Sequence, residues 1–333
     1  MRAAHAALLC ALLGAGCAAP GAGPEPAADA PVLGVGEHRY AWVRDWLVVP
    51  GGGELGNTHG EIVIDSSGLI HLNTDTERAI MVYRPDGTCV RSWGAEFADG
   101  LHGMTIARRD GEERLYFVHF NRHEWVVATL EGQVLLRRGA PLESELYESN
   151  EQFRPTSIAV APDGRIYVAD GYGLNWIHAY DADGNWLAAF GGPELLSTPH
   201  GLCVDTRRDP PLLLVADREH GRIVSFDLDG KLLGTIAQAP DLRRPCKIQQ
   251  QGEWLVVPDL AGRVTILDGD NRVVAQLGDN PDESLRAENG VPREKWADGL
   301  FLAPHSAAWD AEGNLYVMDW NRWGRVNKLQ RLR

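Results

Sequence analysis

A repeated unit dominates the sequence from residue 59 to the C-terminus. Six segments each open on a short polar phrase and continue through apolar runs separated by turns; they begin near His59, His102, Thr156, His200, Cys246 and His305. Five of them carry a turn such as "PDG" or "AEG" after the first run, then a second run that ends in a polar residue, as in "GRIYVADGYG" and "NLYVMDWNRWG". Short alternating runs between Asp-Gly turns are typical of hairpin-connected strands. Four such strands per unit, with units of about 40 residues or more, predict the blades of a β-propeller.

The sixth unit predicts how the ring of blades closes. It runs "HSAAWDAEGNLYVMDWNRWGRVNKLQRLR" and stops after its third strand. The N-terminal stretch "HRYAWVRDWLVVP" has the alternation of the missing strand, so we expect residues 40–49 to pair with the strand at residues 325–332. Such a pairing removes the exposed sheet edges that invite aggregation. Length alone would allow two domains in 333 residues, but the repeat predicts one all-β, six-bladed propeller over residues 37–333.

The first 36 residues predict export. Residues 1–17 carry Arg2 and then an apolar run of signal-peptide length, too short for a membrane span. The ending "LLGAGC" favours a lipoprotein signal with Cys17 as the lipidated residue, although Gly14 stands where that pattern prefers an aliphatic side chain. The alternative is ordinary cleavage after an alanine. Residues 18–36 are rich in Ala, Pro and Gly and predict a flexible linker, so we expect an exported protein that meets the membrane only through a lipid anchor.

Charge and cysteine content restrict the function further. The net charge of −14, with no basic patch to offset it, argues against a nucleic-acid partner. Beyond the signal only Cys89, Cys203 and Cys246 remain, an odd number at no metal-like spacing. The hydrophobic core must therefore hold the fold without a disulfide framework. We expect a monomer that binds a small peptide-like substrate or a protein partner on its channel face.

The histidines at the strand starts predict a metal site on the propeller axis. The first strand of each blade starts on the face where the second ends, so His102, His200 and His305, on blades two, four and six, should surround the central channel. Three imidazoles around one ion, with a further position open, describe a catalytic zinc site. A single histidine before a strand more often only hydrogen-bonds a neighbouring carbonyl. His59 belongs to an odd blade, and we interpret it as a polar channel residue or a supporting partner of the ligands. Cys246 stands in the equivalent place of blade five, as a metal thiolate or, more simply, a small buried residue.

At these residues the chain resembles a known family. The blades resemble NHL repeats, and the propeller is similar to peptidyl-alpha-hydroxyglycine alpha-amidating lyase, most densely over residues 154–226. "RPTSIAVAPDGRIYVADGYGLNWI" matches the blade with the family's catalytic tyrosine, which implies that role for Tyr172. "PHGLCVDTRRDPPLLLVADREHGRI" matches the blade with a zinc histidine and an active-site arginine, here His200 and Arg218. "LHGM" and "APHS" supply the other two zinc histidines, His102 and His305.

The resemblance implies a zinc-dependent carbon–nitrogen lyase. In that family zinc binds the hydroxyl of a hydroxyglycine-extended peptide, the tyrosine removes its proton, and the products are an amidated peptide and glyoxylate. A metal lowers the pKa of a bound hydroxyl, whereas a phenol is a poor base at neutral pH unless a cation such as Arg218 lowers its pKa. Arg218 would alternatively clamp a substrate carboxylate. The structural alternatives are that Tyr172 caps its blade and that Arg218 pairs with an adjacent Asp.

The chain also departs from that family. No arginine in "GLIHLNTDTERA" matches the family's second active-site arginine, because Arg78 lies several residues late. Of the two carboxylates that hold the family's calcium, Asp65 matches, but Ser306 replaces the other, so calcium is weakly supported. Gly173 replaces a cysteine, which removes a disulfide. These departures leave open a different substrate, or binding without catalysis.

Three function classes follow from the sequence. The first is an exported zinc-dependent lyase acting on a hydroxylated, peptidyl-hydroxyglycine-like substrate. The second is a non-catalytic, metal-containing propeller that binds a peptide, glycan or protein, and fold alone does not separate the two. The third, a calcium-dependent lactonase, would need carboxylates around the axis, where this chain has His and Thr. The aspartates that close second strands recur in four blades and are interpreted as turn anchors; they are Asp170, Asp217, Asp259 and Asp319.

Overall fold

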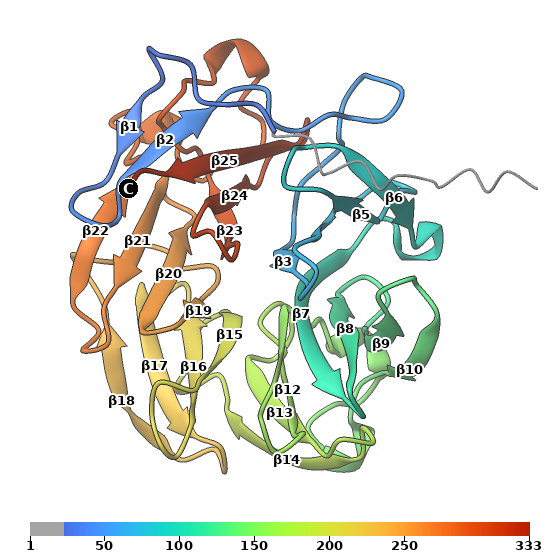
Figure 1. Ribbon diagram of the computed structural model, residues 1–333. Coiled ribbons are helices and arrows are strands. Elements are labelled where there is room, and N and C mark those ends of the chain that lie inside the picture. Colours follow the sequence, from blue (N-terminus) through green and yellow to red (C-terminus); the bar gives the residue numbers. More distant parts are fainter. Residues whose placement is uncertain (1–22) are drawn as a thin grey trace, which may run out of the picture.

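The computed structural model describes residues 23–333 and has the predicted architecture. Its strands form six antiparallel sheets, five with four strands and one with five, and Figure 1 shows them in a ring around a common axis. In this part of the chain, helical structure consists of short 3₁₀ turns, namely η1 (Ala95–Phe97), η2 (Leu142–Ser144), η3 (Asn150–Gln152), η4 (Glu283–Leu285) and η5 (Arg293–Lys295). The predicted all-β, six-bladed fold is therefore confirmed. The predicted signal segment, 1–17, lies outside the described residues.

Blades one to three follow the chain in order, each from its innermost to its outermost strand. Blade one comprises β3 (Ile62–Ile64), β4 (Ile70–Asn73), β5 (Ile80–Tyr83) and β6 (Cys89–Trp93). Blade two comprises β7 (Leu101–Arg109), β8 (Glu112–His119), β9 (Glu124–Thr129) and β10 (Val134–Arg138). Blade three comprises β11 (Ser157–Val160), β12 (Ile166–Ala169), β13 (Trp176–Tyr180) and β14 (Trp186–Gly191).

Blades four to six complete the ring. Blade four comprises β15 (Pro199–Asp205), β16 (Leu212–Asp217), β17 (Arg222–Asp227) and β18 (Leu232–Ala237). Blade five comprises β19 (Gln249–Gln251), β20 (Trp254–Asp259), β21 (Arg263–Leu267) and β22 (Val273–Leu277). Blade six comprises β23 (Pro304–Trp309), β24 (Leu315–Asp319) and β25 (Arg325–Arg331), followed by β2 (Tyr40–Val43) and β1 (Val32–Leu33) from the N-terminal side.

Strand β2 closes the ring, as the truncated sixth unit predicts. It pairs antiparallel with β25, from Tyr40 opposite Arg331 to Val43 opposite Lys328. The pairing is shorter than the expected 40–49, because the chain turns away at Asp45, whose φ is 49°. Strand β1 then pairs with β2 and makes blade six five-stranded. The end of the segment predicted as a linker thus joins the sheet.

The Asp-Gly turns fix the hairpins between the third and fourth strands. In blade three, Asp181 Oδ1 accepts hydrogen bonds from the amides of Asp183 and Asn185, and Gly184 has a φ of 78°. In blade four, Asp227 binds the amides of Asp229 and Lys231 in the same way. A carboxylate that caps its own turn, followed by a glycine in the left-handed region, favours a tight reversal.

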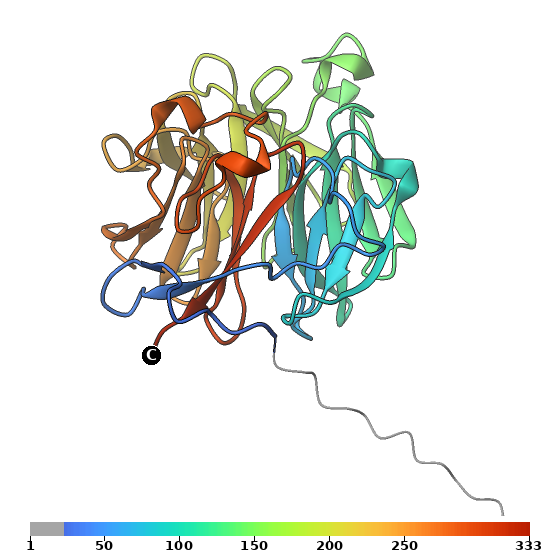
Figure 2. The ribbon, with the colours of Figure 1, turned by 90° about the horizontal axis from the view of Figure 1, so that it is seen from above.

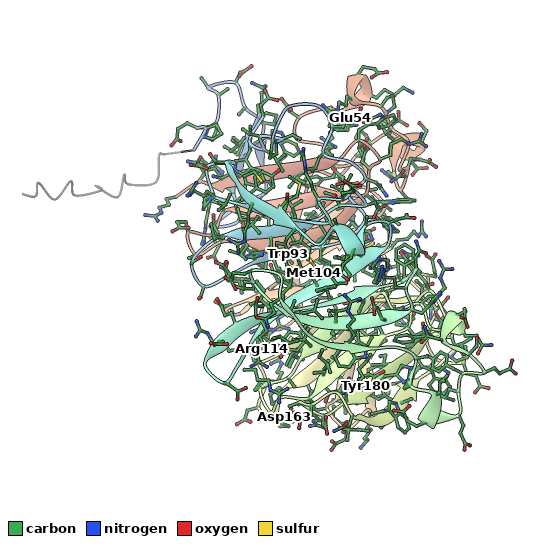
Figure 3. The ribbon with its side chains drawn as sticks, turned by 90° about the vertical axis from the view of Figure 1, so that its right-hand side faces the viewer. Glu54, Trp93, Met104, Arg114, Asp163 and Tyr180 are labelled. Carbon is green, nitrogen blue, oxygen red and sulfur yellow. The ribbon has the colours of Figure 1, made fainter. Side chains whose placement is uncertain are left out.

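Apolar side chains fill the space between neighbouring blades. One cluster joins Phe97 and Met104 with Trp93 between blades one and two, where Trp93 and Met104 are labelled in Figure 3. Another joins Tyr167 and Ile177 of blade three to residues of blade four, including Val215. Because each sheet packs on two neighbours, closure of the ring buries both faces of every blade.

The two faces of the disc differ. Figure 2 shows the 3₁₀ helices on its upper face in that view and the C-terminus on the lower face, where residues 23–31 also run. The connections between blades, and the loops from second to third strands, open on the upper face. Within residues 23–333 no helix is both long and apolar enough to cross a membrane.

Candidate functional site

The structure brings the three predicted zinc ligands together on the axis. His102, His200 and His305 are each the second residue of an innermost strand, β7, β15 and β23. Their ring centroids lie 4.8 Å apart for His102 and His200, 4.9 Å for His102 and His305, and 4.8 Å for His200 and His305. The three rings thus form a nearly regular triangle, as expected for residues related by the alternation of blades.

An irregularity in each strand turns these side chains toward the axis. The pairing register shifts between Leu101 and Met104, between Pro199 and Gly201, and between Pro304 and Ser306. A β-bulge bends its strand and re-aims the side chain that it carries. Each histidine lies within such a shift, so the polar phrase that opens the unit becomes a bulge that points an imidazole inward.

Backbone carbonyls fix the tautomer of all three rings. Nδ1 of His102 lies 2.6 Å from the Thr156 carbonyl oxygen, Nδ1 of His200 lies 2.9 Å from that of Cys246, and Nδ1 of His305 lies 2.8 Å from that of Gly60. A carbonyl only accepts hydrogen bonds, so each Nδ1 carries the proton and each Nε2 presents a lone pair to the axis. Sequence reasoning offered this carbonyl bond as the alternative to metal ligation. The structure shows this carbonyl bond for all three rings, and a metal-bound imidazole makes the same bond through its other nitrogen.

The Nε2 atoms of the three rings are donors of the kind that bind a metal ion. Nε2 of His305 is buried and has no hydrogen-bond partner among the described residues. Burial is the largest cause that lowers the pKa of His102, His200 and His305 well below the usual value of an imidazole. Neutral imidazoles with converging lone pairs are a donor set that suits zinc and other first-row divalent metals.

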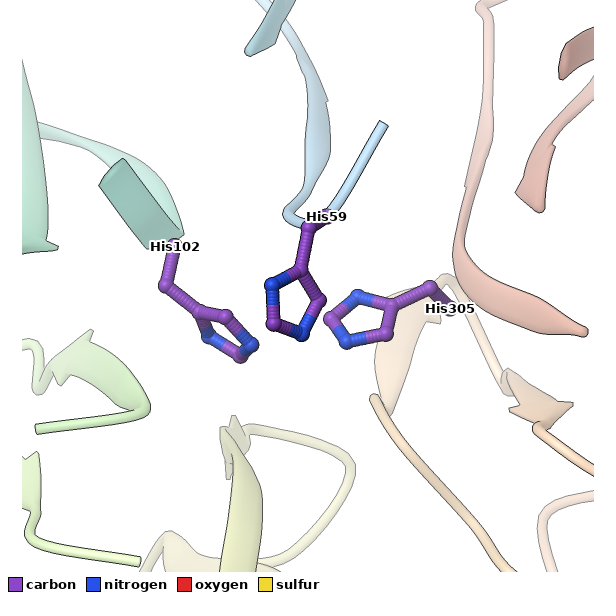
Figure 4. A group of neighbouring side chains, drawn as sticks. All are labelled: His59, His102 and His305. Atoms are coloured by element: carbon purple, nitrogen blue, oxygen red, sulfur yellow. The ribbon is translucent and has the colours of Figure 1, made fainter. Parts of the chain in front are cut away.

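Among residues 23–333, the close groups of donor atoms differ from the predicted triad, because neither of them holds His102, His200 and His305 together. Two groups of donors lie within 4.8 Å of one another: His59 with His102 and His305, and His200 with Cys246 and His305. Each group holds two of the three predicted ligands, and both contain His305. Figure 4 shows the first group, with three rings directed toward one another.

His59 therefore lies beside the His102 and His305 rings, although its own blade is an odd-numbered one. Its ring centroid lies 4.9 Å from that of His102 and 5.2 Å from that of His305. Burial, followed by the charge of Arg218, lowers its pKa to about 4, so it too is neutral at pH 7. Cys246 is buried, and burial raises the pKa of its thiol to about 12.

Tyr172 and Arg218, the predicted catalytic residues, meet at the imidazoles. Tyr172 Oη lies 2.9 Å from His200 Nε2, 3.3 Å from His102 Nε2 and 3.4 Å from His59 Nε2. Arg218 Nη1 donates to the same phenol oxygen at 3.4 Å, and the guanidinium carbon lies 5.6 Å from the tyrosine ring centre. Burial raises the pKa of Tyr172, and the adjacent Arg218 opposes that rise. Arg218 also pairs with Glu219, rather than with the adjacent aspartate that sequence reasoning offered.

The aspartates that close second strands are turn anchors, as predicted. Asp170 accepts from the amides of Arg154 and Leu174 and so holds the loop that carries Tyr172. Asp319 accepts from the amides of Leu302 and Ala303 directly before His305. These hydrogen bonds go to their own turns and to the segments that connect the blades, and none of them reaches the imidazole cluster.

A cavity of about 510 Å³ leads to the site from the loop face. Its lining includes Phe120 and Arg154 besides His59 and Tyr172, and no carboxylate is part of it. The Arg154 guanidinium carbon lies 5.6 Å from the Phe120 ring centre. Sequence reasoning missed both residues. Phe120 lies in the loop after the second strand of blade two, at a position similar to that of Gly171 and Tyr172 in blade three. The repeat could therefore have indicated Phe120 as a site residue. A larger cavity, about 620 Å³, lies at the side of the propeller against residues 42–55 and contains none of these side chains.

Asp65, which matches a calcium carboxylate of the resembled family, and Ser306 and Arg78, which depart from that family, make hydrogen bonds with neighbouring residues. Asp65 accepts hydrogen bonds from Ser67 and from the amide of Leu69, and it contacts His71 Nε2 at 2.9 Å. Ser306 Oγ accepts from the Ile62 amide. Arg78 donates to the Pro50 carbonyl at the surface. The oxygens of Asp65 and Ser306, at the two positions compared with the family's calcium site, thus accept hydrogen bonds from within the protein.

Comparisons with known proteins agree with the resemblance. No family model matches the chain. It is 25% identical over 284 residues to peptidyl-alpha-hydroxyglycine alpha-amidating lyase 1 of Drosophila melanogaster, which covers 76% of this chain and 49% of that protein. It is 33% identical over 187 residues to lyase 2 of the same organism, covering 53% of this chain and 42% of that protein. The chain thus spans half or less of the length of these relatives.

Solved structures support the fold. A gluconolactonase from Xanthomonas campestris superposes with a TM-score of 0.63 at 16% identity, covering 93% of this chain and 97% of that one. The chain is a six-bladed propeller, similar in fold to lactonase propellers. In sequence it is similar to the peptidyl-alpha-hydroxyglycine alpha-amidating lyases, which confirms the predicted resemblance.

Proposed function

We propose that the protein is a metal-dependent carbon–nitrogen lyase that cleaves a peptidyl-hydroxyglycine-like substrate. One observation carries this proposal: the Tyr172 phenol oxygen lies within 3.4 Å of three imidazole nitrogens and of a guanidinium. A phenol fixed among neutral lone pairs and beside one cation is placed to exchange a proton with a bound hydroxyl. His102, His200 and His305 would hold zinc, which lowers the pKa of a hydroxyl that it meets.

The roles of the chain's own residues follow from their contacts. Tyr172 Oη takes the proton of the substrate hydroxyl, and the Arg218 charge favours the deprotonated phenol that this transfer needs. Cleavage of the C–N bond leaves an aldehyde, and the departing amide nitrogen takes a proton, which Tyr172 is placed to return. Arg154, at the carboxylate-free mouth, offers a positive charge to the substrate carboxylate. The products would be a peptide amide and glyoxylate.

A non-catalytic metal-binding propeller is the second candidate, and His59 is the observation that favours it. Its nitrogen belongs to one of the two close donor groups. A fourth imidazole would complete a tetrahedral set and leave no open position, as in structural zinc sites. The same face would then bind a peptide, glycan or protein without chemistry.

One experiment separates the two candidates. The purified protein is analysed for bound metals and incubated with an α-hydroxyglycine-extended peptide, and glyoxylate release is followed. We expect about one zinc per chain and glyoxylate release that stops after chelation and returns with zinc. The same peptide ending in unhydroxylated glycine is the control, since it lacks the group to be deprotonated. Bound metal without turnover would favour the binding propeller, and absence of stoichiometric divalent metal would overturn both.

We also propose that the protein is exported and lipid-anchored at Cys17. Residues 23–31 run on the face opposite the 3₁₀ helices (Figure 2), so an anchor preceding them would leave the site face directed away from the membrane. Cys17→Ala should release the protein from the membrane fraction and abolish incorporation of a labelled fatty acid. Membrane association that survives this change would contradict the anchor.

A further inference from the structure

We propose that Glu61, Ser157 and Lys247 form an axial cluster that positions the imidazoles of the site. The inference rests on the proposed metal site, because it assigns a support for the same three rings. No step of the proposed reaction uses these residues. They lie on the axis directly after the residues whose carbonyls hold the rings.

The cluster is a buried ion pair with a hydroxyl partner. Lys247 Nζ lies 2.7 Å from Glu61 Oε2 and donates to Ser157 Oγ at 3.4 Å. Glu61 is 2% exposed and Lys247 7% exposed. The three residues come from blades one, three and five, so one small polar group ties together the three blades that do not carry the predicted ligands.

Each member of the cluster is covalently adjacent to a carbonyl that orients one ring. Glu61 follows Gly60, the acceptor for His305. Ser157 follows Thr156, the acceptor for His102. Lys247 follows Cys246, the acceptor for His200. A backbone shift at any of these three residues therefore moves the adjoining carbonyl that sets a tautomer, and the bonds between their side chains oppose such a shift.

A second set of bonds holds the ligand strands from the other side. Glu61 Oε2 accepts from the amide of Met104, two residues after His102, at 2.9 Å. Ser157 Oγ accepts from the amide of Leu202, two residues after His200, at 3.1 Å. Lys247 has no acceptor atom, and at blade six Ser306 Oγ instead accepts from the Ile62 amide. Strands β7 and β15 are thus each bonded to two odd-numbered blades. Each strand bonds one of these blades through its histidine ring and the other through a backbone amide.

Close backbone contacts make this arrangement sensitive to small shifts. A Cβ atom on Gly103 would lie 2.4 Å from the Thr156 carbonyl oxygen, and one on Gly201 would lie 2.4 Å from that of Cys246. The ligand strands therefore lie against the acceptor carbonyls with no room for a side chain. A buried ion pair adds little net stability, because desolvation of the two charges offsets their attraction. The Glu61–Lys247 pair instead contributes by fixing the positions of the three residues whose carbonyls accept from the rings.

The test compares two double variants of the full chain. E61M/K247M replaces the pair by apolar side chains of similar length, which commonly leaves stability unchanged or improves it. D205N/R207M is the matched control, because Asp205 and Arg207 form a pair at 2.8 Å that is equally buried but contacts no ring of the site. The first readout is the nitrogen NMR spectrum of metal-free protein labelled in histidine. The second is cobalt affinity together with the cobalt absorption spectrum.

We expect the wild type and the control to show the Nδ1-protonated tautomer for the three rings. E61M/K247M should show mixed tautomers, an altered cobalt spectrum and cobalt affinity about 10–100-fold weaker, the loss typical when groups supporting metal ligands are removed. Unchanged tautomers in E61M/K247M, or an equal change in the control, would overturn the inference. The NMR readout needs no metal and therefore tests the positioning of the rings by itself. A wild type that fails to bind cobalt would refute the proposed metal site, while the NMR spectra would still decide whether the cluster positions the rings.

Discussion

Replacement of Tyr172 by phenylalanine tests the proposed chemistry most directly. The phenol oxygen is the group of this loop that reaches the imidazole nitrogens, while the ring itself packs 5.3 Å from His102, 5.5 Å from His200 and 5.7 Å from Phe120, measured between centroids. Tyr172→Phe keeps these ring contacts and removes only the oxygen. The variant should therefore fold and bind metal as the wild type does, and lose the proton acceptor.

The size of the effect follows from the role of the oxygen. A positioned general base contributes about 10²–10⁴-fold to a rate, which at about 1.4 kcal/mol per tenfold corresponds to about 3–5 kcal/mol of transition-state stabilisation. The free energy of unfolding should change less, by about 1–3 kcal/mol, because loss of the phenol oxygen removes one hydrogen-bond partner from a buried imidazole nitrogen and one from a guanidinium. Turnover should thus fall by at least about 100-fold with a small shift of the unfolding midpoint.

The assay is single-turnover release of glyoxylate, normalised to the metal measured in the same sample. Tyr167→Phe is the matched control, because it removes a phenol from β12 in the same blade, where the oxygen donates to the Leu228 carbonyl far from the rings. The control should keep wild-type turnover. Turnover of Tyr172→Phe within about threefold of wild type at equal metal content would refute the assignment of the phenol as base. Loss of turnover together with metal would show instead that Tyr172 retains the ion.

Three further outcomes are expected. His200→Ala should lose most of the bound metal while its circular dichroism spectrum stays that of a folded propeller, since the ring and not the strand is removed; elemental analysis that still finds stoichiometric metal would contradict its role as ligand. Asp65→Asn should destabilise the protein by about 2 kcal/mol at pH 7 and hardly at all near pH 2. Burial alone would raise the pKa of the Asp65 carboxyl, but hydrogen bonds from His71, Ser67 and Leu69 lower it to about 2, from an unfolded value near 4. That stability is present above the unfolded pKa and lost as pH falls through the folded one, so urea unfolding at both pH values measures it, and a pH-independent difference would disprove the linkage. Trp42→Ala should cost about 3–5 kcal/mol, because this side chain is 3% exposed in the closing strand; a loss below about 1 kcal/mol would mean that β2 does not secure the ring.

The sequence predicts the fold, and the convergence of the candidate site residues, because the chain repeats. Equivalent positions in a repeated unit must occupy equivalent places around the axis, so three histidines at one position of alternate units had to converge. The same logic places Tyr172 and Arg218 on that face, in loops of successive blades. The missing fourth strand of the sixth unit predicts β2, because one strand position remained unfilled.

The features that were not predicted depend on contacts between blades or on short, irregular segments. The repeat placed His59 in the channel but not in a close donor group; its position depends on Thr58, which forms a bridge to Asn321 of blade six and whose hydroxyl donates to the Asp319 carbonyl. No periodic pattern reports such a contact. The Glu61–Lys247 pair joins residues of blades one and five, which are far apart in the sequence, and neither side chain follows a motif. Strand β1 has two residues, too few for an alternation to show.

The pairing of β2 with β25 also has a consequence for the order in which the molecule is made. Synthesis begins at the N-terminus, so Tyr40 emerges among the first residues of the propeller, while its partner Arg331 lies at the end of the chain. The closing strand must therefore wait without its partner β25 until every blade has been synthesised. Throughout that interval the edge of β2 and the buried face of Trp42 are open to other chains. Chaperones that shield nascent segments would therefore bind this strand for longest, until the synthesis of β25 provides its partner.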